Sequence, residues 1–317
     1  MMLLNCCIVK KSNLFKNIIH TKRYGNHKAM SADIKTVLAS KHYGFMGSGN
    51  MSQALVKGFL ASNVITGSQV TMTDRYGLSF PDAEFLIPLK ALCSKYGVEY
   101  IQTNEPMVEK SDVVFACVKP HILLPALKSL SDRLNDKLLV SIAAGITLDQ
   151  IQQAVPKSTR IIRIMPNTPC LVGVGTAVYA HTSSVTEEDI NLISALCSSI
   201  FPVFEAIPES LFNAAVGVSG SSPAYIYMIT EAITDAGVLL GLPRPIAQKL
   251  IVNTILGSAV MMQKTGKSTT ELKNEVCSPG GTTIQGVYAL EKGNLRATLM
   301  DAVQKVCARG EELSKKS

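Results

Sequence analysis

Several patterns that mark other protein classes are missing from this 317-residue chain. No apolar run reaches the roughly 18 to 20 residues that a membrane span requires, so we expect no membrane partner. The eight cysteines include no CxxC pair and have no partner histidines at metal-ligand spacing, which excludes the common zinc patterns. We therefore expect no bound metal, and free thiols in place of a disulfide framework.

A surplus of basic residues is also missing from most of the chain. The formal net charge is +7, but residues 1–40 contain seven Lys or Arg and a single acid, Asp33. The rest of the chain holds 24 basic and 23 acidic side chains. A folded part with so balanced a charge has no basic footprint, which argues against nucleic acid as a partner.

The first 32 residues contain no acid at all, while Lys and Arg are interspersed with Leu, Ile, Val and Phe. This composition is typical of a mitochondrial transit peptide, and we predict a targeting leader over residues 1–40. The alternatives are a disordered leader, or translation from Met30, on a cytoplasmic protein.

Short apolar runs alternate with helical patterns over residues 41–208. The expected strands are residues 42–46, 70–73, 112–118, 138–143 and 160–165, and residues 86–96 have helical spacing. Residues 175–180 and 200–204 could add edge strands. Strands that alternate with helices predict a parallel sheet with helices on both faces.

Residues 209–317 have a different texture, because strand candidates vanish and helical patterns rich in Ala, Ile, Leu and Met replace them. One helix is expected over residues 223–240 and another over residues 245–262. The second is apolar nearly all round, so it must be buried on every side. A domain of this size buries such a helix with difficulty, and we infer that a partner subunit covers it.

A glycine-rich turn follows the first expected strand and opens a helix. Gly47 and Gly49 allow a tight turn and close approach of the backbone, and the helix N-terminus offers N–H groups to a pyrophosphate. The GxGxxG pattern is incomplete because Ser52 stands at the third glycine position. Its place at the first strand–helix junction still favours dinucleotide binding over an ordinary loop. We predict a Rossmann-type domain here.

The identity of the dinucleotide depends on Thr73, Asp74 and Arg75, which end the second expected strand. An acid at this point usually holds the ribose 2′-hydroxyl of NAD, whereas an arginine beside a hydroxyl suits the 2′-phosphate of NADP. Both are present here. Arg75 can pair with phosphate and Thr73 can donate to it, so we predict NADP(H), with NAD(H) possible.

The stretch SPGGTT (278–283) precedes another helical pattern. Two glycines there allow an anion to approach backbone N–H groups at a helix N-terminus, and two threonine hydroxyls add donors. A plain helix cap is the alternative. The double glycine favours an anion site, because each glycine costs about 1 kcal/mol at a helical position.

Six motifs then follow one another in a specific order: GFMGSGNM (44–51), SDVVFACVKPH (111–121), SIAAGIT (141–147), RIMPNTPCLVGVGTAVY (163–179), VSGSSPAY (218–225) and SPGGTTI (278–284). This series resembles the pyrroline-5-carboxylate reductases, which catalyse the last step of proline synthesis, from residue 42 to about 310. The resemblance implies NAD(P)H-dependent reduction of 1-pyrroline-5-carboxylate to L-proline. It also implies a Rossmann domain followed by an all-α domain that forms a homodimer or a multiple of it.

The same resemblance implies a set of site residues. Cofactor contacts are expected from Gly47, Ser48, Gly49, Asn50, Met51, Thr73, Arg75, Asn104, Val118, Lys119, Pro120 and Ala144, with Lys119 acting through its backbone. Substrate contacts are expected from Glu209, Gly280, Gly281, Thr282 and Thr283. The catalytic positions are Thr283, as a donor or proton relay to the imine nitrogen, and Ser278. Asn167 and Pro169 are expected to shape the floor of the pocket, and Cys170 to pack.

Three positions depart from the family pattern. Ser222 replaces the second glycine of a usual Gly-Ser-Gly-Pro, Glu275 replaces a neutral residue, and Asp74 lies where it could repel a phosphate. Together they leave the cofactor preference open.

Two other functions are compatible with parts of the pattern. A β-hydroxyacid dehydrogenase shares the plan of the two domains, but its catalytic lysine has no counterpart in residues 219–230. A non-catalytic NAD(P)-binding regulator would not need the SPGGTT element.

Overall fold

The computed structural model describes residues 32–74 and 89–316. The chain divides into two compact units: a first unit, Met1–Ala215 with Gly310–Ser317, and a helical unit, Val216–Arg309. The predicted boundary at residue 208 therefore lies a few residues before the observed one, and the C-terminal residues return to the first unit. Each unit is described separately below.

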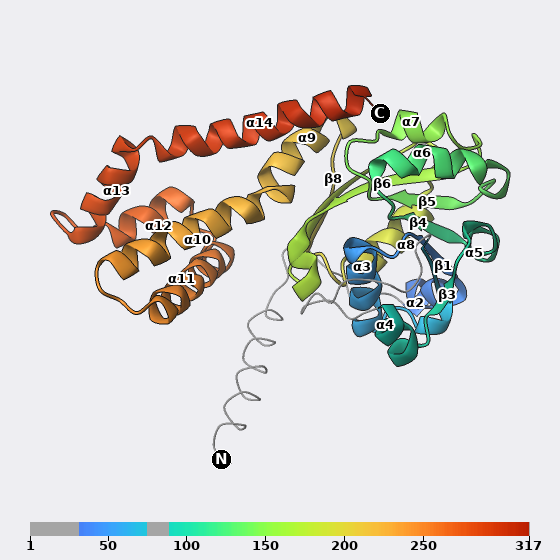
Figure 1. Cartoon of the computed structure of the whole chain (residues 1–317), viewed down its shortest axis with the longest axis horizontal. Helices are drawn as coiled ribbons and strands as arrows, with labels where there is room; N and C mark the ends of the chain where they lie inside the picture. Colours follow the sequence, from blue (N-terminus) through green and yellow to red (C-terminus); the bar gives the residue numbers. More distant parts are fainter. Residues whose placement is uncertain (1–31, 75–88, 317) are drawn as a thin grey trace, which may run out of the picture. The chain divides into compact units, whose positions relative to one another are not determined.

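An eight-stranded sheet forms the centre of the first unit, with strand order β3-β2-β1-β4-β5-β6-β7-β8 (Figure 1). Its strands are β1 (Tyr43–Met46), β2 (Val70–Thr73), β3 (Glu99–Ile101), β4 (Val113–Ala116), β5 (Leu138–Ser141), β6 (Arg160–Pro166), β7 (Thr176–His181) and β8 (Val203–Ala206). Every neighbouring pair is parallel except β6 and β7, which are antiparallel. The five strands expected to form a parallel sheet (β1, β2, β4, β5 and β6) are parallel, as predicted, and β7 adds an antiparallel neighbour to β6. Strand β3 is one that the sequence pattern did not reveal.

Helices cover both faces of this sheet (Figure 1). The helices of the first unit are α2 (Ala32–Ser40), α3 (Asn50–Ala61), α4 (Leu89–Tyr96), α5 (Asn104–Lys110), α6 (Pro120–Ser129), α7 (Leu148–Gln152), α8 (Glu187–Cys197) and the short α9 (Phe212–Ala215), which follows the last strand. The strand β4 shows how two cores arise: Val113 and Phe115 belong to one hydrophobic cluster, and Val114 and Ala116 to another. Successive side chains of a strand point to opposite faces, so an unbroken apolar run is buried on both.

Helix α2 belongs to the folded unit, although we predicted that residues 1–40 form a leader. Leu38 is completely buried in the core, and its carbonyl accepts hydrogen bonds from Tyr43 Oη (3.1 Å) and Gln69 Nε2 (2.7 Å). The folded domain therefore begins before residue 41, and the rest of the predicted leader lies outside the described residues.

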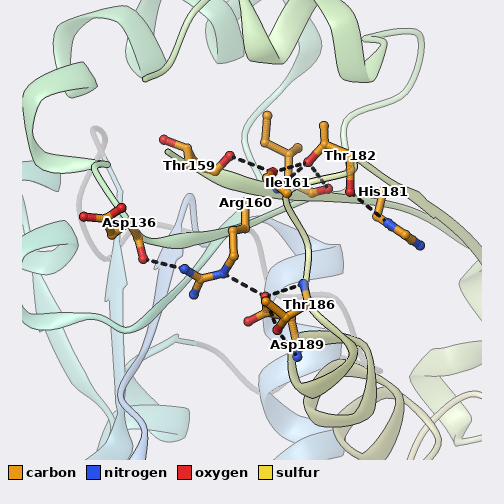
Figure 2. Close-up of polar contacts among 9 residues, drawn as sticks. Asp136, Thr159, Arg160, Ile161, His181, Thr182, Thr186 and Asp189 are labelled. Carbon is orange, nitrogen blue, oxygen red and sulfur yellow. Dashed lines mark hydrogen bonds and ion pairs between the residues drawn. The ribbon is translucent and has the colours of Figure 1, made fainter. Parts of the chain in front are cut away.

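A polar network fixes α8 against the amino-terminal edge of the sheet. Figure 2 shows Arg160, the first residue of β6, directed at Asp189 on α8, with 2.7 Å between Nε and Oδ2. The same guanidinium donates to the carbonyl of Asp136 (2.9 Å), and Asp189 also accepts from the backbone N–H of the N-cap residue Thr186 (3.0 Å). The buried carboxylate of Asp189 thus holds β6 and the start of α8 together through Oδ2.

The helical unit contains a π-helical turn (Val216–Gly220), α10 (Ser222–Leu239), α11 (Arg244–Thr265), α12 (Thr269–Val276), α13 (Thr282–Lys292) and most of α14 (Leu295–Lys316). Helices α10 and α11 pack against each other, and a Cβ at Gly237 would lie 3.0 Å from the Cβ of Ala247. Both helices occur where the sequence pattern placed them, within one to three residues.

Helix α11 is not buried within one chain, contrary to what its composition demands. Leu250 is 57% exposed, and Ile246, Val252 and Met261 are similarly open. Among the described helices it is also the one whose length and composition would allow it to cross a membrane, a test that core helices pass as well. The inference that another surface must cover α11 is therefore still required.

Candidate active site

The turn after β1 has the geometry that a Rossmann glycine provides. Gly47 has φ +96°, and a Cβ at this position would lie 3.0 Å from Val118 Cγ1 and 3.2 Å from the carbonyl oxygen of Cys117. Its N–H donates to the carbonyl of Thr73 (3.1 Å), which joins the ends of β1 and β2. Only glycine combines this left-handed φ with so close a neighbouring strand.

Gly49, in contrast, is not required by the structure of the protein itself. It is the N-cap of α3 with an ordinary φ of −65°, and a Cβ added to it would meet nothing within 4 Å. Neither the backbone nor the packing of the protein explains the missing side chain. Gly49 directly precedes the first N–H groups of a 12-residue helix. An anionic pyrophosphate fits this position, because helix N-termini offer unsatisfied N–H donors and partial positive charge.

Side chains at the end of β2 form hydrogen bonds around this turn. Ser48 Oγ donates to Asp74 Oδ2 (2.5 Å), and Thr73 Oγ1 donates to Asn104 Oδ1 (2.6 Å) on α5. Tyr100 Oη fixes the carbonyl of Asp74 (3.2 Å). Seven predicted cofactor positions thus lie at or beside one turn, namely Gly47, Ser48, Gly49, Asn50, Met51, Thr73 and Asn104. Arg75 lies outside the described residues.

The remaining predicted cofactor positions follow β4 and β5 at the same edge of the sheet. Lys119 is exposed and is the N-cap of α6, which begins at Pro120. Ala144 is exposed in the turn after β5, beside Gly145 with φ +77°. Because β2, β1, β4 and β5 are parallel neighbours, their carboxyl ends form one edge. A dinucleotide binds at such an edge where the strand order reverses, here between β1 and β4.

Glu209 has partners that the sequence did not reveal. Its Oε1 accepts hydrogen bonds from Arg163 Nη1 (2.6 Å) and from the backbone N–H of Leu148 (2.8 Å), at the start of α7. The guanidinium of Arg163 is nearly buried and lies 4.5 Å from the centre of the Phe212 ring. These contacts fix the carboxylate of Glu209, whose role toward the substrate stays a prediction.

The loop after β6 is closed by Asn167. Its Nδ2 donates to Thr176 Oγ1 (3.0 Å) and its Oδ1 accepts from the backbone N–H of Thr176 (2.8 Å). Cys170 in this loop is buried and contacts the sulfur of Met51 (3.6 Å). Burial raises the pKa of the Cys170 thiol to about 11, so the thiol is protonated at neutral pH and packs, as predicted.

In the helical unit, SPGGTT forms a tight turn followed by α13. The N–H of Gly281 donates to the carbonyl of Ser278 (3.0 Å), and Gly280 has φ +67°. Proline then glycine at the two central positions is the pattern of a type II turn. Gly281 is the N-cap of α13, and a Cβ there would lie 3.2 Å from the carbonyl oxygen of Ser278 and closer still to its hydroxyl.

This geometry corrects one expectation about the two glycines. We expected the N–H of Gly281 to be free for an anion, but it closes the turn, and both glycines are explained by the turn itself. The available donors are therefore those of the first turn of α13 and the hydroxyls of Thr282 and Thr283. Thr282 is exposed and Thr283 is half-buried. Ser278 contributes a turn carbonyl, and its catalytic role stays a prediction.

Two of the family departures have local explanations. Ser222 Oγ donates to the carbonyl of Gly217 (3.1 Å), so this extra side chain is bound to the π-helical turn. Glu275 forms an ion pair with Lys267, with 2.6 Å between Oε1 and Nζ, which compensates its charge. Within residues 32–74 and 89–316, no group of three or more His, Cys, Asp or Glu is arranged to hold a metal ion.

The fold and the glycine turn define a dinucleotide-dependent oxidoreductase of the Rossmann class. Residues 42–145 match the family described as NADP oxidoreductase, coenzyme F420-dependent, and residues 209–313 match pyrroline-5-carboxylate reductase dimerisation. Pyrroline-5-carboxylate reductase from Arabidopsis thaliana is 41% identical over 86% of this chain and 95% of its own length. The Escherichia coli enzyme is 41% identical over 87% and 99%.

Solved structures agree with these relatives. The Plasmodium falciparum pyrroline carboxylate reductase with NADP bound matches with a TM-score of 0.77 and 31% identity, over 87% of this chain and 98% of that one. The Coxiella burnetii pyrroline-5-carboxylate reductase matches with a TM-score of 0.78 and 33% identity, over 87% and 99%. The chain belongs to the pyrroline-5-carboxylate reductase family, which removes the β-hydroxyacid dehydrogenase alternative.

Proposed function

We propose that this protein reduces 1-pyrroline-5-carboxylate to L-proline with NAD(P)H, the final step of proline biosynthesis. The observation that carries the proposal is the presence in one chain of the glycine turn after β1 and of the SPGGTT turn at the start of α13. The near-complete coverage of the relatives supports it, because both domains of the family are present. NADP(H) is the expected cofactor, since it is bound in a solved relative.

The substrate offers few groups to recognise, namely a carboxylate and a cyclic imine. The first turn of α13 can receive the carboxylate, because its N–H groups lack intrahelical partners and its dipole favours an anion. The hydroxyls of Thr282 and Thr283 lie at that turn and add neutral donors. Binding the carboxylate at a fixed point orients the ring, which is the main requirement of this reaction.

A bound NAD(P)H supplies the hydride that adds to the imine carbon, while the nitrogen carries the proton and becomes the amine of proline. Thr283 is suited to hold that nitrogen or to relay a proton from water, because an unassisted hydroxyl is a poor general acid. Cys170 takes no part, since its thiol is buried and protonated. The residues of the chain therefore act by orientation and hydrogen bonding.

The assay that tests the proposal follows the consumption of NADPH and the formation of proline by the purified protein. We expect NADPH oxidation only when 1-pyrroline-5-carboxylate is present, with equimolar proline. The same assay with NADH compares the two cofactors. Absence of turnover with both cofactors, in protein that is folded and binds NADPH, would instead support the non-catalytic regulator.

We also propose a homodimer, or a multiple of it, formed through the helical unit. The match to the dimerisation family supports this assembly. So does the exposure of α11, whose apolar side chains are left uncovered in one chain.

Finally, we propose that residues 1–31 direct the protein to mitochondria, on the basis of their acid-free, basic composition. Because α2 belongs to the folded unit, a reporter fused to residues 1–31 alone should reach mitochondria. A diffuse cytosolic signal from that fusion would overturn the proposal and favour a cytoplasmic protein.

A further inference from the structure

Gln53 is a buried polar residue in the first turn of α3, with only 3% of its surface exposed. Its Nε2 donates a hydrogen bond to the backbone carbonyl of Ser48 (2.8 Å). Because a carbonyl oxygen only accepts, this contact fixes which end of the amide is the donor. Its Oε1 is buried without a hydrogen-bond partner among the described residues. An apolar side chain of similar length would leave no such oxygen unpaired, so packing does not explain the amide.

The same residue holds the next carbonyl of the turn. The backbone N–H of Gln53 donates to the carbonyl of Gly49 (3.0 Å), so Gln53 binds one carbonyl oxygen from each of the two peptide groups that flank the Cα of Gly49. Both peptide groups are trans, and in a trans peptide the C=O and N–H bonds point in opposite directions. The N–H groups of Gly49 and Asn50 are therefore directed away from Gln53.

A glycine at this point makes such a hold necessary. Gly49 is the N-cap of α3 with φ −65° and ψ 175°, and it has no side chain to cap the helix. Without a Cβ, a glycine reaches many other combinations of φ and ψ, and each would turn the two N–H groups elsewhere. The bond from Gly47 N–H to the carbonyl of Thr73 fixes the start of the turn, and Gln53 fixes its end. A binding loop that is ordered in advance loses less entropy when its ligand binds.

We propose that Gln53 is a positioning residue for the dinucleotide. Through the carbonyls of Ser48 and Gly49 it holds the N–H groups of Gly49 and Asn50 in the direction from which they donate to the pyrophosphate. Because Gln53 is buried, it acts through the backbone and does not touch the cofactor. The inference rests on the proposed function only in taking a dinucleotide as the ligand of the glycine turn.

Gln53→Met tests the proposal, because methionine is unbranched and of similar length but has no N–H donor in its side chain. The dissociation constant for NADPH is measured by fluorescence titration of the full chain, without substrate. We expect NADPH to bind about tenfold more weakly, a change that corresponds to about 1.4 kcal/mol. Adenosine 2′-monophosphate, which lacks the pyrophosphate, should compete with NADPH using the same dissociation constant in both proteins.

Gln69→Met is the matched control. The Nε2 of Gln69 donates to the carbonyls of Leu38 (2.7 Å), Ala39 (3.1 Å) and Lys41 (2.9 Å), so this variant also loses hydrogen bonds from an amide to the backbone of the first unit. Gln69 precedes β2 at the amino-terminal edge of the sheet, whereas the glycine turn follows β1 at the carboxyl edge. We expect Gln69→Met to lower the midpoint of thermal unfolding and to leave the dissociation constant for NADPH unchanged.

The proposal is overturned if Gln53→Met binds NADPH as tightly as the wild-type protein does. It is equally overturned if NADPH and adenosine 2′-monophosphate weaken by the same factor, or if the variant does not fold, because Gln53 then only supports the structure of the first unit. These outcomes are distinct from a failure of the proposed function. That failure would appear as no turnover of 1-pyrroline-5-carboxylate by a wild-type protein that binds NADPH.

Discussion

The two units of this protein differ sharply in how much apolar surface a single chain can bury. The first unit has aromatic side chains that are completely buried, with the rings of Phe45 and Phe115 stacked at 4.7 Å between centroids. In the helical unit, Ala247 and Ile251 are the buried hydrophobic residues, whereas Leu239 and Leu240 are more than 80% exposed. The first unit therefore has its own core, and the second must obtain one from another copy.

Among the tests of this comparison, we expect the largest effect from a charge introduced on the exposed apolar surface of α11. Leu250→Glu places a carboxylate where we expect a dry subunit contact, so the dimer should dissociate and activity should disappear. Sedimentation equilibrium at micromolar concentration measures the first effect. Lys249→Glu introduces a carboxylate at an adjacent position that is already polar, and it should stay assembled.

NADPH binding shows whether the Leu250→Glu protein is still folded in its first unit, which we expect. A fully assembled and active Leu250→Glu protein would mean that α11 is not at the subunit contact.

A cavity in the core of the first unit should lower the stability of that unit by the same amount whether or not the subunits are assembled. Phe115→Ala removes a ring that packs between Phe45 and Phe59, and should destabilise this unit by about 3–5 kcal/mol. Unfolding followed at several protein concentrations should show the same loss at each. For the helical unit, the transition midpoint should instead rise with concentration. If the loss of stability caused by Phe115→Ala depended on protein concentration, the first unit would not be stable independently of assembly, and the distinction between the units would be lost.

The contrast extends to ligands, because the glycine turn and the SPGGTT turn lie in different units. Thr283→Ala should raise KM for 1-pyrroline-5-carboxylate and lower kcat, together about tenfold to a hundredfold, for a charge-assisted contact of about 1.5–3 kcal/mol. Its dissociation constant for NADPH should not change. Thr283→Ser should recover most activity.

Gly47→Ala is the matched opposite, because its methyl group would crowd Val118 and the left-handed φ is strained. We expect it to weaken NADPH binding and leave the KM for substrate almost unchanged. Gly281→Ala is a poor substitute for the threonine variants, because it disturbs the SPGGTT turn. If Thr283→Ala and Gly47→Ala changed the KM for substrate and the dissociation constant for NADPH equally, the two turns would not bind separate ligands.

The smallest expected effect is on the pH dependence of the first unit. Burial and the neighbouring Lys110 lower the pKa of His42 below its usual 6.5, against the opposing influence of Glu99 and Asp112. Between the lowered pKa of His42 in the folded state and its usual pKa of 6.5 in the unfolded state, the unfolded chain binds more protons than the folded one. Stability of the first unit should be complete above pH 6.5 and decline slightly as the pH falls below it.

His42→Gln should flatten this decline, because glutamine does not titrate but can still bond to Thr71, which lies 2.8 Å from Nε2 of His42. Thermal unfolding at pH 5.5 and 7.5 measures the difference. An unchanged slope in His42→Gln would assign the acid sensitivity to other groups.

The features that could be predicted from the sequence are those with local signals. The glycine turn, the apolar strands and the helix after SPGG all depend on residues within one short segment. β3 was missed because Glu99–Ile101 is three residues long and only partly buried. The antiparallel direction of β7 and the contact between Arg163 and Glu209, 46 positions apart, depend on the whole fold. Gly281 was misread because the turn and an anion site require the same residue type.

The division of the chain has a topological consequence. The polypeptide leaves the first unit after Ala215 and re-enters it at Gly310, where Gln150 Nε2 donates to the carbonyl of Ser314 (3.2 Å). The helical unit is thus an insertion within a discontinuous domain, and not an appendage at its end. A fragment that stops at Ala215 would lack the last turns of α14, which lie beside Gly145 in the turn after β5. Isolating the first unit intact therefore requires joining residue 215 to residue 310 through a short linker.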